Sequence, residues 1–246
     1  MKTFTIRIAP VVAVGLLGWL LGFVGRGGAT TPPEQNKDFV GWTTEFGEDK
    51  KDLMNTGKNP YFILEPGHFT IMEAGDERIV HTVLFETKMV DGVETRVVEE
   101  RETKGETLVE VSRNYYAISK RTNSVYYFGE EVDIYKNGKI TSHEGSWMSG
   151  VKGAKYGLMM AGTPLVKGKY YQEIAPGQAM DRAEIISVTE TMATPAGTFK
   201  NCLVTEETSA MEPDKMNKYY APGIGQISDG KLKLVKHGFL DKAKAK

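Results

Sequence analysis

The sequence NYYAISKRTNSVYYFGEEVDIYKNGKITSHEGSW, residues 114–147, decides the expected fold. Runs of aromatic and β-branched residues flank a polar turn at 120–123, and a second turn follows at Asn137-Gly138. An Asn-Gly pair between alternating segments predicts a tight hairpin, because both residues tolerate the positive φ of a type I′ turn. The stretch therefore indicates antiparallel sheet that is dense in large apolar side chains.

The same alternation of strands and turns extends along most of the chain. Upstream, the runs 79–90 and 93–103 flank an Asp91-Gly92 turn, and Gly105 marks the next turn. Consecutive hairpins of this kind predict a meander rather than βαβ units. No apolar period of 3.6 residues is sustained after residue 60, so we expect little helix. Further strands are expected at 61–64, 69–73, 107–119, 169–175, 180–193, 199–207, 215–220, 224–228 and 231–236.

We expect an all-β fold whose strongly curved antiparallel meander sheet forms a half-barrel or open barrel. In the run 107–119, Val111 and Tyr115 share one face, while Glu110 and Ser112 share the other. This alternation predicts one apolar face and one solvated face. Strands of about a dozen residues span roughly 40 Å and twist strongly, so a sheet that curls on itself would cover its apolar face.

The first 29 residues predict export. Lys2 and Arg7 precede an uncharged run at 8–24, IAPVVAVGLLGWLLGFV, and Ala29 offers a small side chain for cleavage after it. The length of the run lies between that of a long signal-peptide core and that of a short membrane-spanning helix. Residues 1–29 are therefore a signal peptide or an N-terminal membrane anchor. Either interpretation places the rest of the chain in the periplasm or outside the cell, free or anchored to the inner membrane.

The remaining chain divides by composition. Residues 30–60 are polar and are expected to form a linker, in which Trp42 is free to dock onto the domain. Residues 61–238 should form a single antiparallel β domain, and 239–246 a disordered basic tail. Within the domain, the Gly-rich stretch 145–168 breaks the pattern and predicts an irregular excursion across one end of the sheet or a plug over its concave face.

Charge and cysteine content exclude several function classes. The net charge of −1 supplies no field that would attract nucleic acid, and membrane contact is expected only through residues 8–24, if that segment is not cleaved. The single cysteine, Cys202, excludes an intramolecular disulfide and a thiolate-rich metal site, and its strand-like surroundings predict a buried apolar role. We expect no cofactor. The four histidines lie in separate segments without metal-ligand spacing: His68, His81, His143 and His237.

Several short motifs give the chain a resemblance to known proteins. They are Tyr61-Phe62, Pro66-Gly67, 126–130 (YYFGE), 145–147 (GSW), Gly150-Val151, Gly153-Ala154, Gln172-Glu173, 176–179 (PGQA) with Asp181 and Ala183, and 219–225 (YYAPGIG). With these motifs, residues 60–230 resemble a family of secreted, periplasmic bacterial proteins of unknown function. The last motif is similar to the ending of exported β proteins, some with the half-barrel of periplasmic lipoprotein carriers. The resemblance implies a fold and a location, and no catalytic residue.

The sequence favours a non-enzymatic exported protein that binds an apolar ligand, a lipid or a hydrophobic peptide, on a concave sheet face. Two alternatives stay open. One is a structural or interaction module that binds another envelope protein, and the other is a metal-dependent enzyme, which no motif in the sequence supports. A Cu(I) site that uses Met148, Met159 and Met160 is another interpretation, although flexible packing also explains those side chains. The candidate ligand-binding residues are Tyr115, Tyr127, Trp147, Met159 and Met160.

Overall fold

The computed structural model describes residues 41–211 and 215–241. The expected signal or anchor segment, 1–29, lies outside the described residues, as does most of the expected basic tail. Among the residues that are described, no helix is both long and apolar enough to cross a bilayer.

The described chain is all-β and antiparallel, as the sequence predicts, and its one helical element is the 3₁₀ helix η2 (Lys50–Asp52). Sixteen strands form one sheet, and a separate pair, β2 and β3, forms another. The strands are β1 (Leu53–Met54), β2 (Lys58–Asn59), β3 (Phe62–Ile63), β4 (His68–Ala74), β5 (Glu77–Val90), β6 (Val93–Lys104), β7 (Thr107–Ser119), β8 (Val125–Lys136), β9 (Lys139–Ser142), β10 (Trp147–Met148), β11 (Lys155–Met160), β12 (Lys169–Tyr171), β13 (Glu173–Ile174), β14 (Asp181–Thr194), β15 (Gly197–Ser209), β16 (Lys215–Ala221), β17 (Gly225–Asp229) and β18 (Leu232–Phe239).

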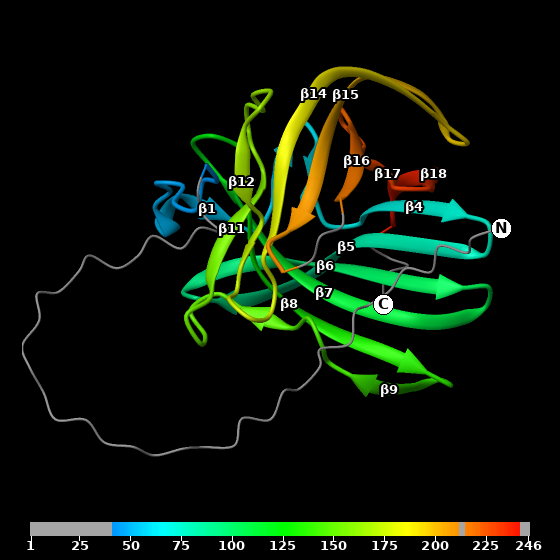
Figure 1. The fold of residues 1–246 in the computed structure, drawn as a ribbon, viewed down its shortest axis with the longest axis horizontal. Helices are drawn as coiled ribbons and strands as arrows, with labels where there is room; N and C mark the ends of the chain where they lie inside the picture. The colour runs from blue at the N-terminus through cyan, green and yellow to red at the C-terminus, as the bar shows by residue number, and fades with distance from the viewer. Residues whose placement is uncertain (1–40, 212–214, 242–246) are drawn as a thin grey trace, which may run out of the picture. The chain divides into compact units, whose positions relative to one another are not determined.

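The sheet is nearly closed into a barrel. Its strand order is β12-β14-β15-β16-β17-β18-β4-β5-β6-β7-β8-β11-β13. The two end strands, β12 and β13, are consecutive in the chain, with only Gln172 between them. The sheet therefore curls until one short segment contributes both of its ends, which goes further than a half-barrel (Figure 1).

The hairpin turns have the backbone that the sequence predicts. At the β5–β6 turn, Asp91 and Gly92 have φ angles of 49° and 78°, and at the β8–β9 turn, Asn137 and Gly138 have 54° and 72°. Two successive positive φ angles are the mark of a type I′ turn, whose twist suits the flanking strands. These turns fix the register of the long meander strands.

The stretch 145–168 is more regular than expected. It contains β10 and β11, and β11 pairs with both β8 and β13. Gly157 explains why the sequence conceals this strand: a Cβ added there would lie 2.2 Å from the carbonyl oxygen of Gln172. Only glycine permits such a close approach, and it interrupts the alternation by which a strand is recognised.

The outer face of β7 and β8 is covered by residues 41–54, which we call the N-terminal arm. Phe46 and Leu53 pack there against a cluster that includes Tyr115 and Phe128. The part of the expected linker that the structure describes is thus docked on the sheet, and Trp42 likewise contacts Tyr171, with ring centroids 6.1 Å apart.

Candidate functional site

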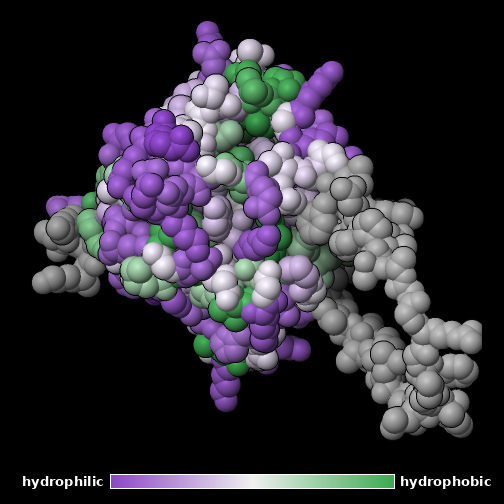
Figure 2. Space-filling model, turned by 90° about the vertical axis from the view of Figure 1, so that its left-hand side faces the viewer, coloured by the Kyte–Doolittle hydropathy of each residue, from purple (hydrophilic) through white to green (hydrophobic). Residues whose placement is uncertain are grey.

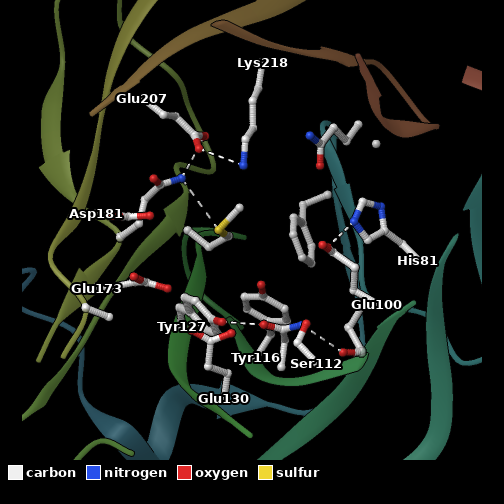
Figure 3. Close-up of a pocket in the computed structure, with 18 of the residues that line it drawn as sticks. His81, Glu100, Ser112, Tyr116, Tyr127, Glu130, Glu173, Asp181, Glu207 and Lys218 are labelled. Atoms are coloured by element: carbon white, nitrogen blue, oxygen red, sulfur yellow. Dashed lines mark hydrogen bonds and ion pairs between the residues drawn. The ribbon is translucent and has the colours of Figure 1, made fainter. Parts of the chain in front are cut away.

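The inside of the barrel holds a cavity of about 480 Å³ that is open to solvent, which we call the lumen. This volume lies within the range of small-molecule sites, which measure about 300 to 1,000 Å³. Polar and charged side chains project into it from both walls (Figure 3). Its charged and aromatic lining residues are His68, His81, Glu100, Glu110, Tyr116, Tyr127, Glu130, Glu173, Asp181, Glu207, Lys218 and Tyr220, with Phe62 at one side.

Strand register builds the first wall of the lumen. In the paired strands β5, β6 and β7, His81 lies opposite Glu100, and Glu100 lies opposite Ser112. The next inward row contains Asn114 on β7 opposite Glu130 on β8. Directly opposite residues of neighbouring strands point to the same face, so these rows bring their polar groups together. The His81 imidazole is hydrogen-bonded to the carboxylate of Glu100.

The second wall comes from the C-terminal strands and the closing segment. The ammonium of Lys218 on β16 lies 3.0 Å from Glu207 on β15. The same carboxylate accepts hydrogen bonds from the Tyr220 hydroxyl, at 3.2 Å, and from the side-chain amide of Gln172, at 3.1 Å. Because Gln172 joins the two end strands, this bond couples the closure of the barrel to the lining of the lumen.

The lumen carries an excess of acidic groups. Six carboxyl side chains line it, whereas Lys218 is the only lysine or arginine among the lining residues. That lysine is already engaged, since its ammonium also lies 3.5 Å from Asp229. A space with this balance favours positive charge or hydrogen-bond donors in whatever occupies it.

The acidic excess shifts the pKa values of the carboxyl groups upward. Burial raises the pKa of Glu130 to about 8, and the charges of Glu100, Glu110 and Asp181 add to this shift, while Tyr127 works against it. Burial likewise raises the pKa of Glu173, with the charges of Asp181 and Glu130 as the next causes. Such groups hold their protons near neutral pH unless a cation approaches them.

At the opposite end of the lumen, the pKa of Glu100 is lowered instead of raised. Burial acts to raise the pKa of Glu100, but the charge and the hydrogen bond of His81 outweigh it and lower the value to about 2. The resulting carboxylate then repels its neighbours. Burial first, and Glu100 next, raise the pKa of Glu102 to about 8 and that of Glu110 to about 7.

The structure brings four of the five sequence-predicted site residues together. Tyr127 and Met159 line the lumen. Trp147 packs edge-on against Tyr127, with ring centroids 5.3 Å apart, and Met160 is fully buried in the same cluster. These side chains form the apolar base from which the polar lumen opens.

Tyr115 lies elsewhere. It packs on the outer face of β7, under the N-terminal arm, and its hydroxyl donates to Glu131. The inward face of β7 is instead the one that carries Glu110, Ser112 and Asn114, which the sequence suggests to be solvated. The sequence therefore predicts the two faces of β7 correctly, but it does not predict which face lines the cavity.

Sequence reasoning missed the charged lining. Glu130, Glu173, Gln172, Asp181 and Tyr220 all lie within the motifs that carry the family resemblance. Membership of those motifs is the sequence signal that could have identified them as lining residues. These motifs are far apart in the chain and meet only around the lumen.

A metal site is not preformed in the part of the chain that the structure describes. No group of three His, Cys, Asp or Glu side chains among those residues is placed to hold a metal ion. Among the methionines considered for Cu(I), Met148 packs in the outer cluster and Met160 in the inner one. No family model, curated protein or solved structure matches the chain.

Proposed function

We propose that this chain is an exported, non-enzymatic β protein that binds a small polar organic molecule in its lumen. The observation that carries the proposal is a cavity of about 480 Å³ lined by carboxyl, amide, imidazole and hydroxyl groups. A hydrogen-bonding lining of this kind rewards a ligand with matching polar groups, because an apolar one would leave the buried groups unpaired.

The lining favours a polar ligand over the apolar ligand that the sequence suggests. A lipid or hydrophobic peptide suits a concave apolar face, whereas the inward residues here include Glu100, Ser112 and Glu207. Tyr116 and Tyr127, stacked with ring centroids 4.6 Å apart, offer a flat apolar surface within the polar lining. A compact molecule with polar groups on its rim and one apolar face fits this combination.

The alternative of an envelope interaction module draws less support from the surface. Figure 2 shows a mostly hydrophilic face on which hydrophobic side chains form small, separate groups. Leu165 and Ile186 are among the exposed large hydrophobic residues. Stable protein interfaces usually need a broader contiguous patch.

Native mass spectrometry of the protein purified from its own cell envelope tests the proposal. The expected result is a bound small polar molecule, and a retained lipid would overturn it. Two variants in the β14–β15 hairpin provide a test and its control. Ser209→Phe on β15 places a ring in the lumen, whereas Ser187→Phe on β14 changes a residue that does not line it. Only Ser209→Phe should reduce occupancy, and equal occupancy in both variants would argue against binding in the lumen.

A further inference from the structure

Three carboxyl groups meet at one corner of the lumen, which we call the acidic corner. Glu130 comes from β8, Glu173 from β13 and Asp181 from the start of β14 (Figure 3). The charges of Glu130 and Asp181 each act on Glu173, so the three groups are within electrostatic reach of one another. Bringing like charges together in a secluded space costs free energy unless a positive charge joins them.

No ion pair brings such a charge to two members of the corner in the described chain, although the charge of Lys218 acts on Glu173 from a distance. Neither Glu130 nor Glu173 forms an ion pair with any described lysine, arginine or histidine. Glu173 is only 9% exposed. Lys218, the one lysine of the lining, is held between Glu207 and Asp229 on the far wall. A positive charge paired with Glu130 and Glu173 would therefore come from a ligand.

A buried donor without an acceptor lies against the same corner. The Trp147 side chain is 5% exposed, and its indole N–H acts to lower the pKa of Glu173, so the two groups are near neighbours. Yet Nε1 has no hydrogen bond of acceptable geometry within the described chain. An indole N–H can only donate, and buried donors are seldom left unpaired. Trp147 lines a neighbouring hollow that shares Glu130 with the lumen, so a ligand oxygen that reaches past Glu130 would satisfy it.

The aromatic rings next to the corner favour an organic cation over a metal ion. Tyr127 lies between Trp147 and Tyr116 in ring-to-ring contact, with centroid distances of 5.3 Å and 4.6 Å. Aromatic faces attract ammonium groups through the ring quadrupole. By contrast, no described set of three ligating side chains is placed for a metal.

From these observations we infer that the acidic corner is the ammonium subsite of the lumen, and that its ligand is an organic amine with a hydroxyl or other accepting oxygen close to the nitrogen. This inference rests on the proposed function and names the ligand class. The ammonium lies between Glu130 and Glu173, and the neighbouring oxygen accepts from Trp147.

The binding step has a proton balance that can be measured. Near neutral pH, the Glu130 carboxyl is largely protonated when the lumen holds no ligand. The groups that face it are Tyr127 and the carboxyl groups of Glu173, Asp181, Glu100 and Glu110. The lysine of the lining, Lys218, is paired on the far wall. An arriving ammonium stabilises the ionised form, so the carboxyl proton leaves to solvent as the amine binds. Affinity for the amine therefore rises with pH toward about 8, provided that the amine itself stays charged.

Isothermal titration calorimetry with a matched pair of probes, 1-amino-1-deoxysorbitol and sorbitol, tests the inference on the full chain. The probes differ by one ammonium in place of one hydroxyl. We expect the amine to bind about tenfold or more tightly than sorbitol, as a charge-assisted hydrogen bond predicts. In buffers with different heats of ionisation, only the amine should release protons.

Variants separate the corner from general charge effects. Glu130→Gln and Glu173→Gln should each weaken amine binding about tenfold and weaken sorbitol binding much less, because an amide still hydrogen-bonds to a hydroxyl but no longer pairs with an ammonium. Glu106→Gln removes the same charge at an exposed turn and should alter neither. Circular dichroism establishes that each variant is folded, and if Glu173→Gln fails to fold, Glu130→Gln carries the test.

The outcomes distinguish the inference from the proposed function. If both probes bind equally and the variants change neither, the ammonium subsite is overturned while a polar-ligand lumen stands. The subsite is likewise overturned if sodium chloride stabilises the protein as much as the amine does. Binding of n-octanol in place of both polyols would overturn the proposed function itself.

Discussion

The ammonium of Lys218 lies 3.0 Å from the carboxylate of Glu207 across the wall of the lumen. Burial acts to lower the pKa of Lys218, but the charges of Asp229 and Glu207 outweigh it and raise the value. This lysine therefore stays charged and balances two acidic groups that would otherwise face each other in a secluded space.

Replacing the lysine should destabilise the barrel. Lys218→Met leaves Glu207 and Asp229 without their counter-charge, and we expect the free energy of unfolding at pH 7 to fall by about 3 kcal/mol. Urea denaturation measures the change. Lys215→Met is the control, since its partner Glu206 is at the exposed end of the same strand pair, and it should cost less than about 1 kcal/mol. Equal losses would show that the lumen pair has no special role.

Stability should decrease as pH rises from about 4.5 to about 8. The pKa of Glu130 is raised to about 8 and that of Glu110 to about 7, whereas the pKa of a glutamate in the unfolded chain is about 4.3. Between these values the two glutamates hold more protons in the folded chain than in the unfolded chain, so they make the free energy of unfolding decrease with pH. They outweigh His68, whose pKa burial lowers to about 4 and whose effect is the opposite below about pH 6.5. The expected result is a lower urea midpoint at pH 8 than at pH 5.

One substitution assigns part of this pH dependence. Glu130→Gln removes a titrating group from the lumen, so the decline of the urea midpoint with pH should become shallower and the variant should gain on the wild type at pH 8. Glu106→Gln, in an exposed turn, should leave the decline unchanged. A decline that Glu130→Gln does not alter would contradict the assignment.

The sequence predicted the strands and turns well because they depend on local chemistry. Asp91-Gly92 and Asn137-Gly138 adopt the positive φ angles that their types favour, wherever they occur in a fold. Closure of the sheet depends on a long-range event instead, the meeting of β12 and β13 on either side of Gln172. No local pattern encodes that meeting.

The lumen escaped prediction for a related reason. Alternation along β7 separates Tyr115 from Ser112 and Asn114, but it does not say which set is enclosed. The N-terminal arm decides, because Phe46 and Leu53 cover the Tyr115 side and leave the polar side to face the cavity. Since the arm is polar overall, its composition indicates a linker and its few apolar contacts pass unnoticed.

The close approach at Gly157 should be essential for closure. A Cβ at this position would lie 2.2 Å from the carbonyl oxygen of Gln172 and 2.7 Å from that of Tyr171, and neither backbone atom can turn aside as a side chain would. We expect Gly157→Ala to lower the free energy of unfolding by about 3 kcal/mol, the upper range for overpacking. Urea denaturation of the purified variant measures this.

A second glycine calibrates that measurement. Gly105 has a φ of +57°, and an added Cβ would have no atom within 4 Å, so Gly105→Ala introduces backbone strain without a clash. Its expected cost is about 1 kcal/mol. If Gly157→Ala costs no more than Gly105→Ala, β11 and the closing segment are more loosely packed than described.

The last prediction concerns Glu48, which fastens the N-terminal arm. Its carboxylate, with 1% of the side chain exposed, accepts hydrogen bonds from the Ser119 hydroxyl at 3.0 Å and the Tyr126 hydroxyl at 3.4 Å, and lies 3.3 Å from the Arg121 guanidinium. Glu48→Ala leaves these groups without their acceptor. We expect the free energy of unfolding to fall by about 2 to 3 kcal/mol, as for other buried groups that lose a charged partner.

Limited proteolysis distinguishes a docked arm from a linker. In the wild type the arm should resist cleavage, and in Glu48→Ala it should be cut before the barrel strands, because its main polar anchor is lost. Glu45→Ala is the matched control: Glu45 pairs with Lys155 on the surface, with 79% of its side chain exposed, and its loss should cost less than about 1 kcal/mol. Rapid cleavage of the wild-type arm would mean that residues 41–54 do not protect the outer face, and the polar face of β7 would then owe its enclosure to the barrel strands alone.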